Sequence, residues 1–200
     1  MIAIIDYGAG NLFNAQKAME ALGYDAVVTG DPQTIRDASK LILPGVGAFP
    51  SAMEQLNQSG LAQLLREQVQ GGKSLLGICL GMQLLFDRSE EVTPTPGLGL
   101  IQGCVKRLTK APKIPHMGWN DLHFPQSHPV FSGIDEGAYV YFVHSFCAQE
   151  VRPEDLIATT EYGETITAAV ARDNVIGMQY HPEKSSAVGL RMLRNFAEMK

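Results

Sequence analysis

The stretch "LLGICLGMQLLF", residues 75–86, is an apolar run in which two glycines bracket a single cysteine. Glycine is normally kept out of buried strands and helices, because it costs backbone entropy and packs against nothing. Gly77 and Gly81 each stand two residues from Cys79, which predicts a tight turn from a strand into a helix over 81–89. Small residues flank a nucleophile held at such an elbow, because larger neighbours would clash.

The residues before this turn alternate between strand and helix patterns. The apolar strand candidates are "MIAIID", "AVVTG", "KLILPG" and "KSLLGI". The helical patterns between them cover residues 11–23, 31–39 and 48–70, with Asp31 as a cap before Pro32 and a break near Ser59-Gly60. Alternation of this kind predicts a parallel sheet with helices on both of its faces.

The second half of the chain is richer in β patterns. After a loop-like stretch at 89–100, several strand candidates follow up to His181, and Tyr162-Gly163 and Asp173-Asn174 provide hairpin turns. Residues 185–200 return to a helical period. We therefore expect one α/β domain over residues 1–200: a central mixed, mostly parallel sheet flanked by helices, with an antiparallel-rich second half.

Composition narrows the possible partners. The 200 residues carry 16 Lys and Arg against 21 Asp and Glu, a formal charge of −5, and no basic cluster suggests nucleic-acid binding. No apolar stretch approaches the ~20 residues of a membrane helix, and the N-terminus lacks the basic region of a signal peptide. Cys79, Cys104 and Cys147 form no CxxC pair. We expect free thiols in a reducing cytoplasm, with no membrane partner.

Cys79 has two interpretations. As an elbow nucleophile it would have a helix N-terminus directly behind it, which favours the thiolate, and the backbone N–H of Leu80 would point at a developing oxyanion. As a buried, inert cysteine it would only pack, which is the commoner fate of a lone cysteine. The pair of glycines around it favours the functional interpretation.

A cysteine nucleophile needs a base, and five histidines compete for the role. Two have a carboxylate two residues away, in Asp121-x-His123 and His181-x-Glu183. His181 is favoured because it leaves an apolar strand at the sheet edge where open α/β folds place their sites, although the pattern alone does not exclude His123. No further ligands stand at zinc spacing, so we expect no metal.

Two glycine-rich stretches also invite functional interpretation. "LPGVGAF", residues 43–49, is either a plain strand-to-helix turn or a loop whose backbone amides approach a ligand and supply a second oxyanion donor. "DYGAGN", residues 6–11, resembles the start of a dinucleotide-binding motif. That interpretation fails, because Phe13 stands where the third glycine is needed.

Three of these motifs together carry a family resemblance. "LPGVGAF", "GICLGMQLL" and "MQYHPEKS" occur in the order and at the separations typical of the class I (triad) glutamine amidotransferases, and the resemblance covers essentially the whole chain. "DYGAGNL", "IPHMGWN" and "YFVHSF" are similar to a subgroup of that family, the glutaminase subunits of imidazole glycerol phosphate synthases.

The resemblance implies a role for each matching position. Cys79 matches the nucleophile, His181 the general acid and base, and Glu183 the carboxylate that orients the imidazole. Val46 and Leu80 match positions whose backbone N–H groups form the oxyanion hole. The residues implied to hold L-glutamine are Gly47, Gln83 and the backbone of His144, Ser145 and Phe146.

The resemblance also implies a partner, a (β/α)8 cyclase that receives the ammonia in a heterodimer, and it implies no cofactor. The positions matching the partner surface are Asn11, Asn14, Trp119 and Lys184. Structural interpretations exist for each: Trp119 as core, Lys184 as a solvated charge and the asparagines as helix caps. Because Gly45 and Gly47 flank Val46, its peptide can rotate at low steric cost, so we expect low activity until the partner binds its nucleotide ligand.

Two alternatives from other classes stay open at this point. A different cysteine hydrolase of similar fold, peptidase-like or deglycase-like, would use the same elbow without glutamine specificity. A non-catalytic binding module would carry an inert Cys79, alkylated no faster than Cys104 or Cys147.

Overall fold

The structure is a computed structural model that describes residues 1–199. The chain forms these elements in order: β1 (Ile2–Ile5), α1 (Leu12–Ala21), β2 (Ala26–Thr29), α2 (Pro32–Asp37), β3 (Lys40–Gly45), α3 (Phe49–Gln58), α4 (Leu61–Gln70), β4 (Ser74–Cys79), α5 (Leu80–Gln83), β5 (Phe86–Ser89), β6 (Thr95–Pro96), β7 (Ile101–Arg107), β8 (His116–Asp121), β9 (Tyr139–His144), β10 (Phe146–Gln149), β11 (Leu156–Glu161), β12 (Thr165–Arg172), β13 (Val175–Met178) and α6 (Ser186–Glu198). Short 3₁₀ turns occupy η1 (Pro129–Phe131), η2 (Pro153–Asp155) and η3 (Pro182–Lys184).

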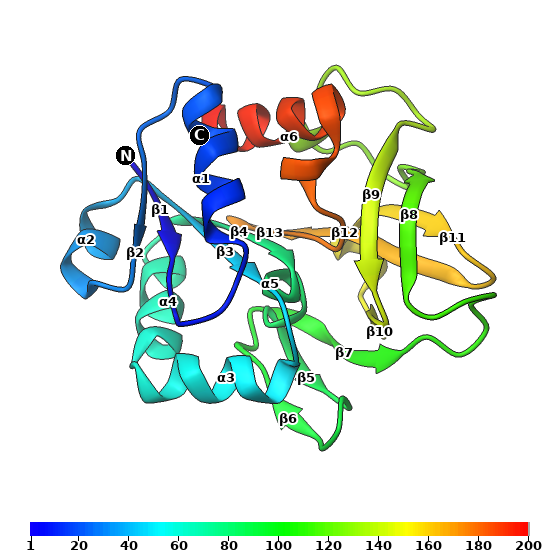
Figure 1. Ribbon diagram of the computed structural model, residues 1–200, viewed down its shortest axis with the longest axis horizontal. Helices are drawn as coiled ribbons and strands as arrows, with labels where there is room; N and C mark the ends of the chain where they lie inside the picture. Colours follow the sequence, from blue (N-terminus) through cyan, green and yellow to red (C-terminus); the bar gives the residue numbers. More distant parts are fainter. Residues whose placement is uncertain (200) are drawn as a thin grey trace.

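The centre of the molecule is a seven-stranded sheet in the order β11-β12-β13-β4-β3-β1-β2 (Figure 1). The five strands from β13 to β2 are parallel, and β11 and β12 continue the sheet as antiparallel hairpins. This confirms the expected mixed, mostly parallel sheet. The hairpin turns fall at 162–164 and 173–174, as Tyr162-Gly163 and Asp173-Asn174 predicted.

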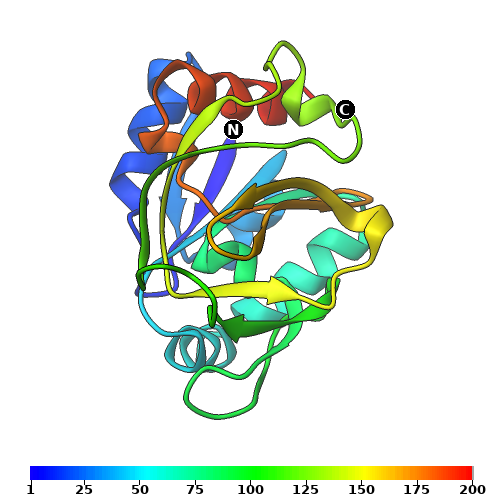
Figure 2. The same cartoon turned by 90° about the vertical axis from the view of Figure 1, so that its right-hand side faces the viewer.

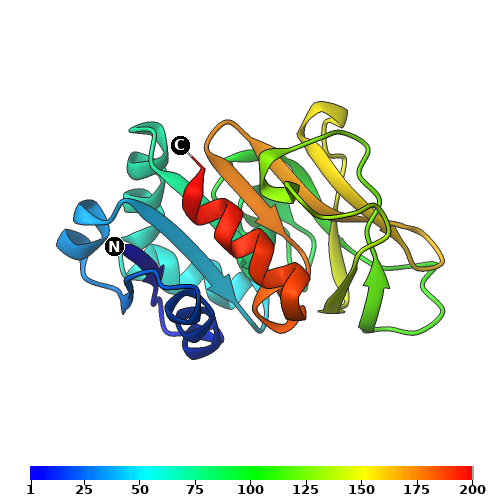
Figure 3. The ribbon, with the colours of Figure 1, turned by 90° about the horizontal axis from the view of Figure 1, so that it is seen from above.

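Alternation along the buried strands builds a core on each face of this sheet. In β1, Ala3 and Ile5 face one cluster and Ile2 and Ile4 the other. The first cluster contains buried residues of α2, α3 and α4, and the second contains those of α1 and α6. Seen from above, α6 lies across the near face and α3 and α4 lie behind the strands (Figure 3).

The second half of the chain adds two smaller sheets beside the central one (Figure 2). One has the order β10-β7-β5-β6 and the other is the antiparallel pair β8-β9. Within residues 1–199, no helix is long and apolar enough to cross a membrane.

The helix predicted over 81–89 is wrong beyond its first turn. Only α5, residues Leu80–Gln83, is helical, and Phe86–Ser89 is strand β5. The reason is that the segment at 98–100 folds back against the end of α5. The carbonyls of Leu84 and Leu85 accept hydrogen bonds from the N–H groups of Leu98 and Leu100, both at 2.8 Å, so they do not continue a helix. Strand pairing with β7 then overrides the local helical pattern.

Candidate active site

The elbow at Cys79 explains the two glycines around it. Cys79 ends β4 with φ 57° and ψ −114°, a conformation that side chains rarely adopt, and α5 begins at the next residue. A Cβ on Gly77 would lie 2.6 Å from the carbonyl oxygen of Gly81, and a Cβ on Gly81 would lie 1.7 Å from that of Leu43. Both positions exclude any larger side chain, because the backbone reverses against itself and against β3.

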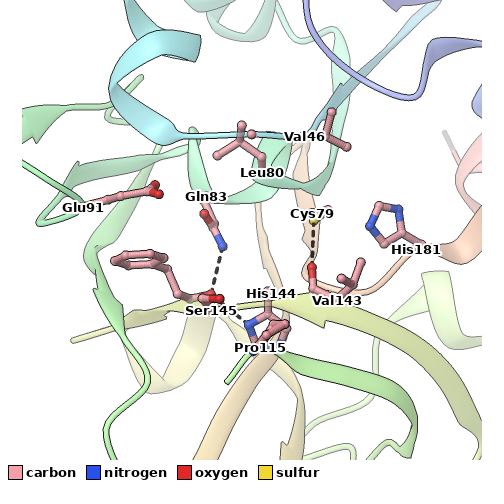
Figure 4. Close-up of a pocket in the computed structure, with 12 residues that line it drawn as sticks. Val46, Cys79, Leu80, Gln83, Glu91, Pro115, Val143, His144, Ser145 and His181 are labelled. Carbon is pink, nitrogen blue, oxygen red and sulfur yellow. Dashed lines mark hydrogen bonds between the residues drawn. The ribbon is translucent and has the colours of Figure 1, made fainter. Parts of the chain in front are cut away.

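The parallel strands β13, β4, β3 and β1 end at one edge of the sheet, and a pocket of about 340 Å³ opens there (Figure 4). Nine of the ten residues that the sequence assigns to catalysis, the oxyanion hole and glutamine binding line it: Val46, Gly47, Cys79, Leu80, Gln83, His144, Ser145, Phe146 and His181. The tenth, Glu183, lies behind His181. The volume of the pocket falls within the range of small-molecule sites.

His181 and Glu183 form a buried pair. Their side chains are each 3% exposed, and Nδ1 of His181 lies 2.8 Å from Oε1 of Glu183. Burial opposes the charge of the imidazolium, but the neighbouring thiol of Cys79 and the hydrogen-bonded carboxylate of Glu183 outweigh it and raise the pKa of His181 to about 9. The ring is therefore poised to carry a proton at neutral pH.

The sulfur of Cys79 faces the pocket beside the imidazole of His181 (Figure 4). Among residues 1–199, Nε2 of His181 is buried without a hydrogen-bond partner. The Sγ atom lies 3.9 Å from the carbonyl oxygen of Val143 and 4.0 Å from Nε2 of Gln179. A thiol, an imidazole with one free nitrogen and an orienting carboxylate are the groups of a nucleophile–base–orienter arrangement.

Gln83, the last residue of α5, is held in place by neighbours at the start of β10 and just after β13. Its Nε2 donates to the carbonyl oxygen of Phe146 and to Oε1 of Gln179, both at 2.9 Å. Gln179 is fully buried and was missed by the sequence analysis. A signal was present: Gln179 stands two residues before His181, and strand alternation places such residues on one side.

The loop after β3 forms the opposite wall. Val46 is 45% exposed, and Gly47 adopts φ +100° with open space where a Cβ would stand. Gly45 is different, because a Cβ there would lie 2.7 Å from Oη of Tyr7 and 2.9 Å from the backbone nitrogen of Gly81. Close packing requires the first glycine of this loop, and a left-handed backbone favours the second.

Two further residues at this site carried no sequence signal that we recognised. Glu91 lines the pocket, and its Oε2 accepts a hydrogen bond of 2.9 Å from the N–H of Phe49, where α3 begins directly after the Val46 loop. Tyr7 is 5% exposed, and in the described part of the chain its buried hydroxyl has no partner. Burial, and then the charge of Cys79, raise the pKa of this phenol.

The other two cysteines lie in the interior. Cys104 is fully buried and Cys147 is 1% exposed. Burial raises the pKa of both thiols, that of Cys147 to about 12. Neither lines the pocket.

Two of the four residues assigned to a partner surface lie against the same ring, that of Tyr141. Trp119 is 50% exposed and packs edge-on against Tyr141 at 6.2 Å, while Nζ of Lys184 lies 6.0 Å from the centre of the same ring. Asn11 stands at the N-cap of α1 without a capping hydrogen bond from its side chain, and Asn14 is exposed on that helix. Trp119 is not a core residue, and the side chain of Asn11 does not cap its helix.

The family model "Glutamine amidotransferase class-I" matches residues 3–199. The chain belongs to the class-I glutamine amidotransferases. Within that family it is similar to proteins named imidazole glycerol phosphate synthase subunit HisH. The relative from Geobacillus thermodenitrificans is 50% identical over 98% of this chain and 94% of its own, and that from Syntrophotalea carbinolica is 49% identical over the whole of both.

Solved structures support the fold. A glutamine amidotransferase superimposes with a TM-score of 0.78 at 20% identity, covering 99% of this chain and 98% of its own. The PurLQS structure from Thermotoga maritima gives 0.79 at 19% identity, covering 98% of this chain and 96% of that chain. At these identities the likeness concerns the fold alone.

Proposed function

We propose that this chain is the glutaminase subunit of an imidazole glycerol phosphate synthase. It hydrolyses L-glutamine to L-glutamate and ammonia, and the ammonia passes to a (β/α)8 cyclase in a cytoplasmic heterodimer. The observation that carries the proposal is the convergence of Cys79, at a strained elbow, with the buried His181–Glu183 pair in one pocket. The full-length HisH relatives support the choice of subgroup.

The proposed reaction divides into two steps. The thiolate of Cys79 attacks the side-chain amide carbon, and the imidazolium of His181 protonates the departing nitrogen, so that ammonia leaves and a thioester remains. Neutral His181 then takes a proton from water, whose oxygen attacks the thioester and releases glutamate, and the proton returns to the sulfur. A raised pKa suits His181 to the first step, because the amide is a poor leaving group unless protonated.

The pocket walls suit the rest of the substrate. Backbone N–H groups of Leu80 and Val46 are the proposed oxyanion donors, each worth on the order of 3 kcal/mol of transition-state stabilisation. The backbone of His144, Ser145 and Phe146 faces the α-carboxylate, and the carboxylate of Glu91 suits the α-ammonium group. Misplacing one oxyanion amide would nearly silence the enzyme, which gives a partner a place to act.

The test is glutamate release from glutamine by the chain alone, with the cyclase, and with the cyclase plus its nucleotide substrate. We expect activity mainly in the last condition and none with Cys79→Ala. Full activity of the isolated chain would contradict gating by the partner. No glutamate in any condition, with folded protein and active cyclase, would contradict the proposed function and favour another cysteine hydrolase.

A further inference from the structure

We propose that His116, supported by Asn120, is a positioning residue that holds the glutamine-binding segment 144–146 through a directed chain of hydrogen bonds. This inference rests on the proposed function, because His116 would act on glutamine through that segment. His116 does not line the pocket, and nothing in the sequence motifs around Cys79 or His181 points to it.

The chain of contacts runs inward from β8. Nδ2 of Asn120 lies 3.3 Å from Nε2 of His116, and Nδ1 of His116 lies 3.0 Å from Nε2 of His144. Nδ1 of His144 in turn lies 2.8 Å from the carbonyl oxygen of Phe146. His116 is 2% exposed and His144 is 6% exposed, so the contacts between the two rings are shielded from water.

The partners at the two ends fix the direction of every hydrogen bond. A carbonyl oxygen only accepts, so Nδ1 of His144 carries a proton and its Nε2, in the neutral ring, accepts. Nδ1 of His116 must then be the donor to that nitrogen. This leaves Nε2 of His116 as an acceptor, and the amide nitrogen of Asn120, which can only donate, supplies the matching proton.

The surroundings keep both rings neutral and in place. Burial lowers the pKa of His116 to about 4 and that of His144 to about 3, so neither ring is charged near neutral pH. The ring of His116 is stacked between Phe142, with centroids 4.7 Å apart, and Tyr162, at 4.0 Å. Asn120 is fixed in turn by donating to the carbonyl oxygen of Glu161 at 3.0 Å.

The series of hydrogen bonds ends at Phe146, in the segment proposed to bind the substrate. The carbonyl oxygen of Phe146 accepts from both His144 and Gln83, at 2.8 and 2.9 Å, and all three residues line the pocket. This carbonyl belongs to the peptide group that follows Phe146, so its two hydrogen bonds fix the end of the segment 144–146, which faces the α-carboxylate in the proposed complex. Without a donor from His116, Nε2 of His144 would be left buried and unpaired, and the ring would be free to turn.

Two substitutions separate hydrogen bonding from packing. His116→Phe keeps an aromatic ring between Phe142 and Tyr162 but removes the donor to His144. His116→Asn removes the ring but keeps an amide N–H attached at the same distance from Cβ as Nδ1. His128→Phe is the control, because His128 is a hydrogen-bonded, partly buried histidine outside the pocket.

The readout compares two alkylating reagents on Cys79, measured by peptide mass spectrometry on the chain in complex with the cyclase and its nucleotide substrate. One is a glutamine-shaped diazoketone, which needs the α-carboxylate contacts, and the other is iodoacetamide, which does not. We expect His116→Phe to lower the rate ratio by about tenfold, as expected for the loss of one buried hydrogen bond that positions the binding segment, and His116→Asn and His128→Phe to stay within about threefold of the parent.

The outcomes distinguish this inference from the proposed function. If the parent shows no preference for the glutamine-shaped reagent, the proposed function fails, and the inference with it. If the parent shows the preference and His116→Phe keeps it, the positioning role is overturned alone. Nitrogen-15 shifts of the parent at pH 7 provide a test independent of any variant: we expect a bare Nε2 on both rings, and a proton on either overturns the directed chain.

Discussion

The imidazole of His181 makes the stability of the folded protein depend on pH. Its pKa is raised to about 9 by Cys79 and Glu183 against the cost of burial, while an unfolded histidine titrates near 6.5. The folded state thus binds this proton more tightly. The stabilisation is complete below about pH 6.5 and is lost as the pH rises through about 9.

We expect Glu183→Gln to weaken this dependence. The amide keeps a hydrogen-bond partner for Nδ1 of His181 but removes the negative charge, so the pKa of His181 should fall and the free energy of unfolding should decline less between pH 6.5 and 9. The measurement is a series of urea titrations across that range, with histidine shifts followed by NMR. An unchanged His181 titration in the variant would show that the carboxylate charge has no part in the shift.

The three thiols should differ sharply in reactivity. Cys79 opens into the pocket, whereas Cys104 and Cys147 are buried with pKa values raised by desolvation. Because the thiolate is the nucleophile, we expect iodoacetamide at pH 8 to label Cys79 at least about tenfold faster than either of the others. Peptide mapping over time measures this, with Cys79→Ala as the control. Equal labelling of all three would support the inert-cysteine interpretation.

At the scale of elements, the elbow between β4 and α5 excludes any side chain larger than that of glycine at position 81. A Cβ on Gly81 would meet the carbonyl oxygen of Leu43 at 1.7 Å, and backbone cannot move aside as a flexible side chain can. We expect Gly81→Ala to lower the free energy of unfolding by more than about 3 kcal/mol or to prevent folding.

Gly23→Ala is the matched control for this substitution. Gly23 has a positive φ, +87°, which Gly81 does not, but its Cβ would meet nothing within 4 Å. The backbone strain alone should then cost about 1 kcal/mol. Urea titration of both variants compares close approach with backbone strain, and a loss for Gly81→Ala no larger than that for Gly23→Ala would mean that close approach does not explain the glycine at 81.

The elements also show which parts of the fold a sequence can predict. Strands β1 to β4 and helices α1 to α4 follow apolar periodicity and caps such as Asp31, whose side chain accepts from the N–H of Thr34 as expected. Strand β5 could not be predicted from periodicity or caps, because the backbone N–H groups that hydrogen-bond to the carbonyls of Leu84 and Leu85 come from the loop at 98–100. The local helical pattern at 81–89 does not indicate that this distant loop folds back against it.

The residues of the candidate site also divide into those that local sequence patterns indicate and those that they do not. The glycine bracket and the His-x-Glu spacing are local signals, and the structure gathers those residues around one pocket. Glu91 lies in a loop without regular pattern, and the roles of Tyr7 and His116 depend on contacts between segments distant in the sequence. Gln179 carried one local signal, its spacing from His181. Local patterns indicated the groups that react, whereas most of the groups that hold them became visible only in three dimensions.

At the scale of the whole molecule, the exposed aromatic surface beside the pocket requires an explanation. Trp119 is 50% and Met117 59% exposed on β8, and Tyr141 packs against Trp119 and lies beneath Nζ of Lys184. A large aromatic residue left half in solvent contributes little to folding, but tryptophan is among the residues most often found at the energetic centre of an interface. Under the proposed function, this surface meets the cyclase.

We therefore expect Trp119→Ala to weaken cyclase binding by roughly tenfold to a hundredfold, about 1–3 kcal/mol, while the urea midpoint stays near that of the parent. Trp119→Phe should lose less, because it keeps an aromatic face for Tyr141. Titration calorimetry measures the affinity, and glutaminase activity at saturating cyclase measures what is left of activation. A variant that binds normally but unfolds more easily would assign Trp119 to the fold rather than the interface, and the partner surface would then lie elsewhere.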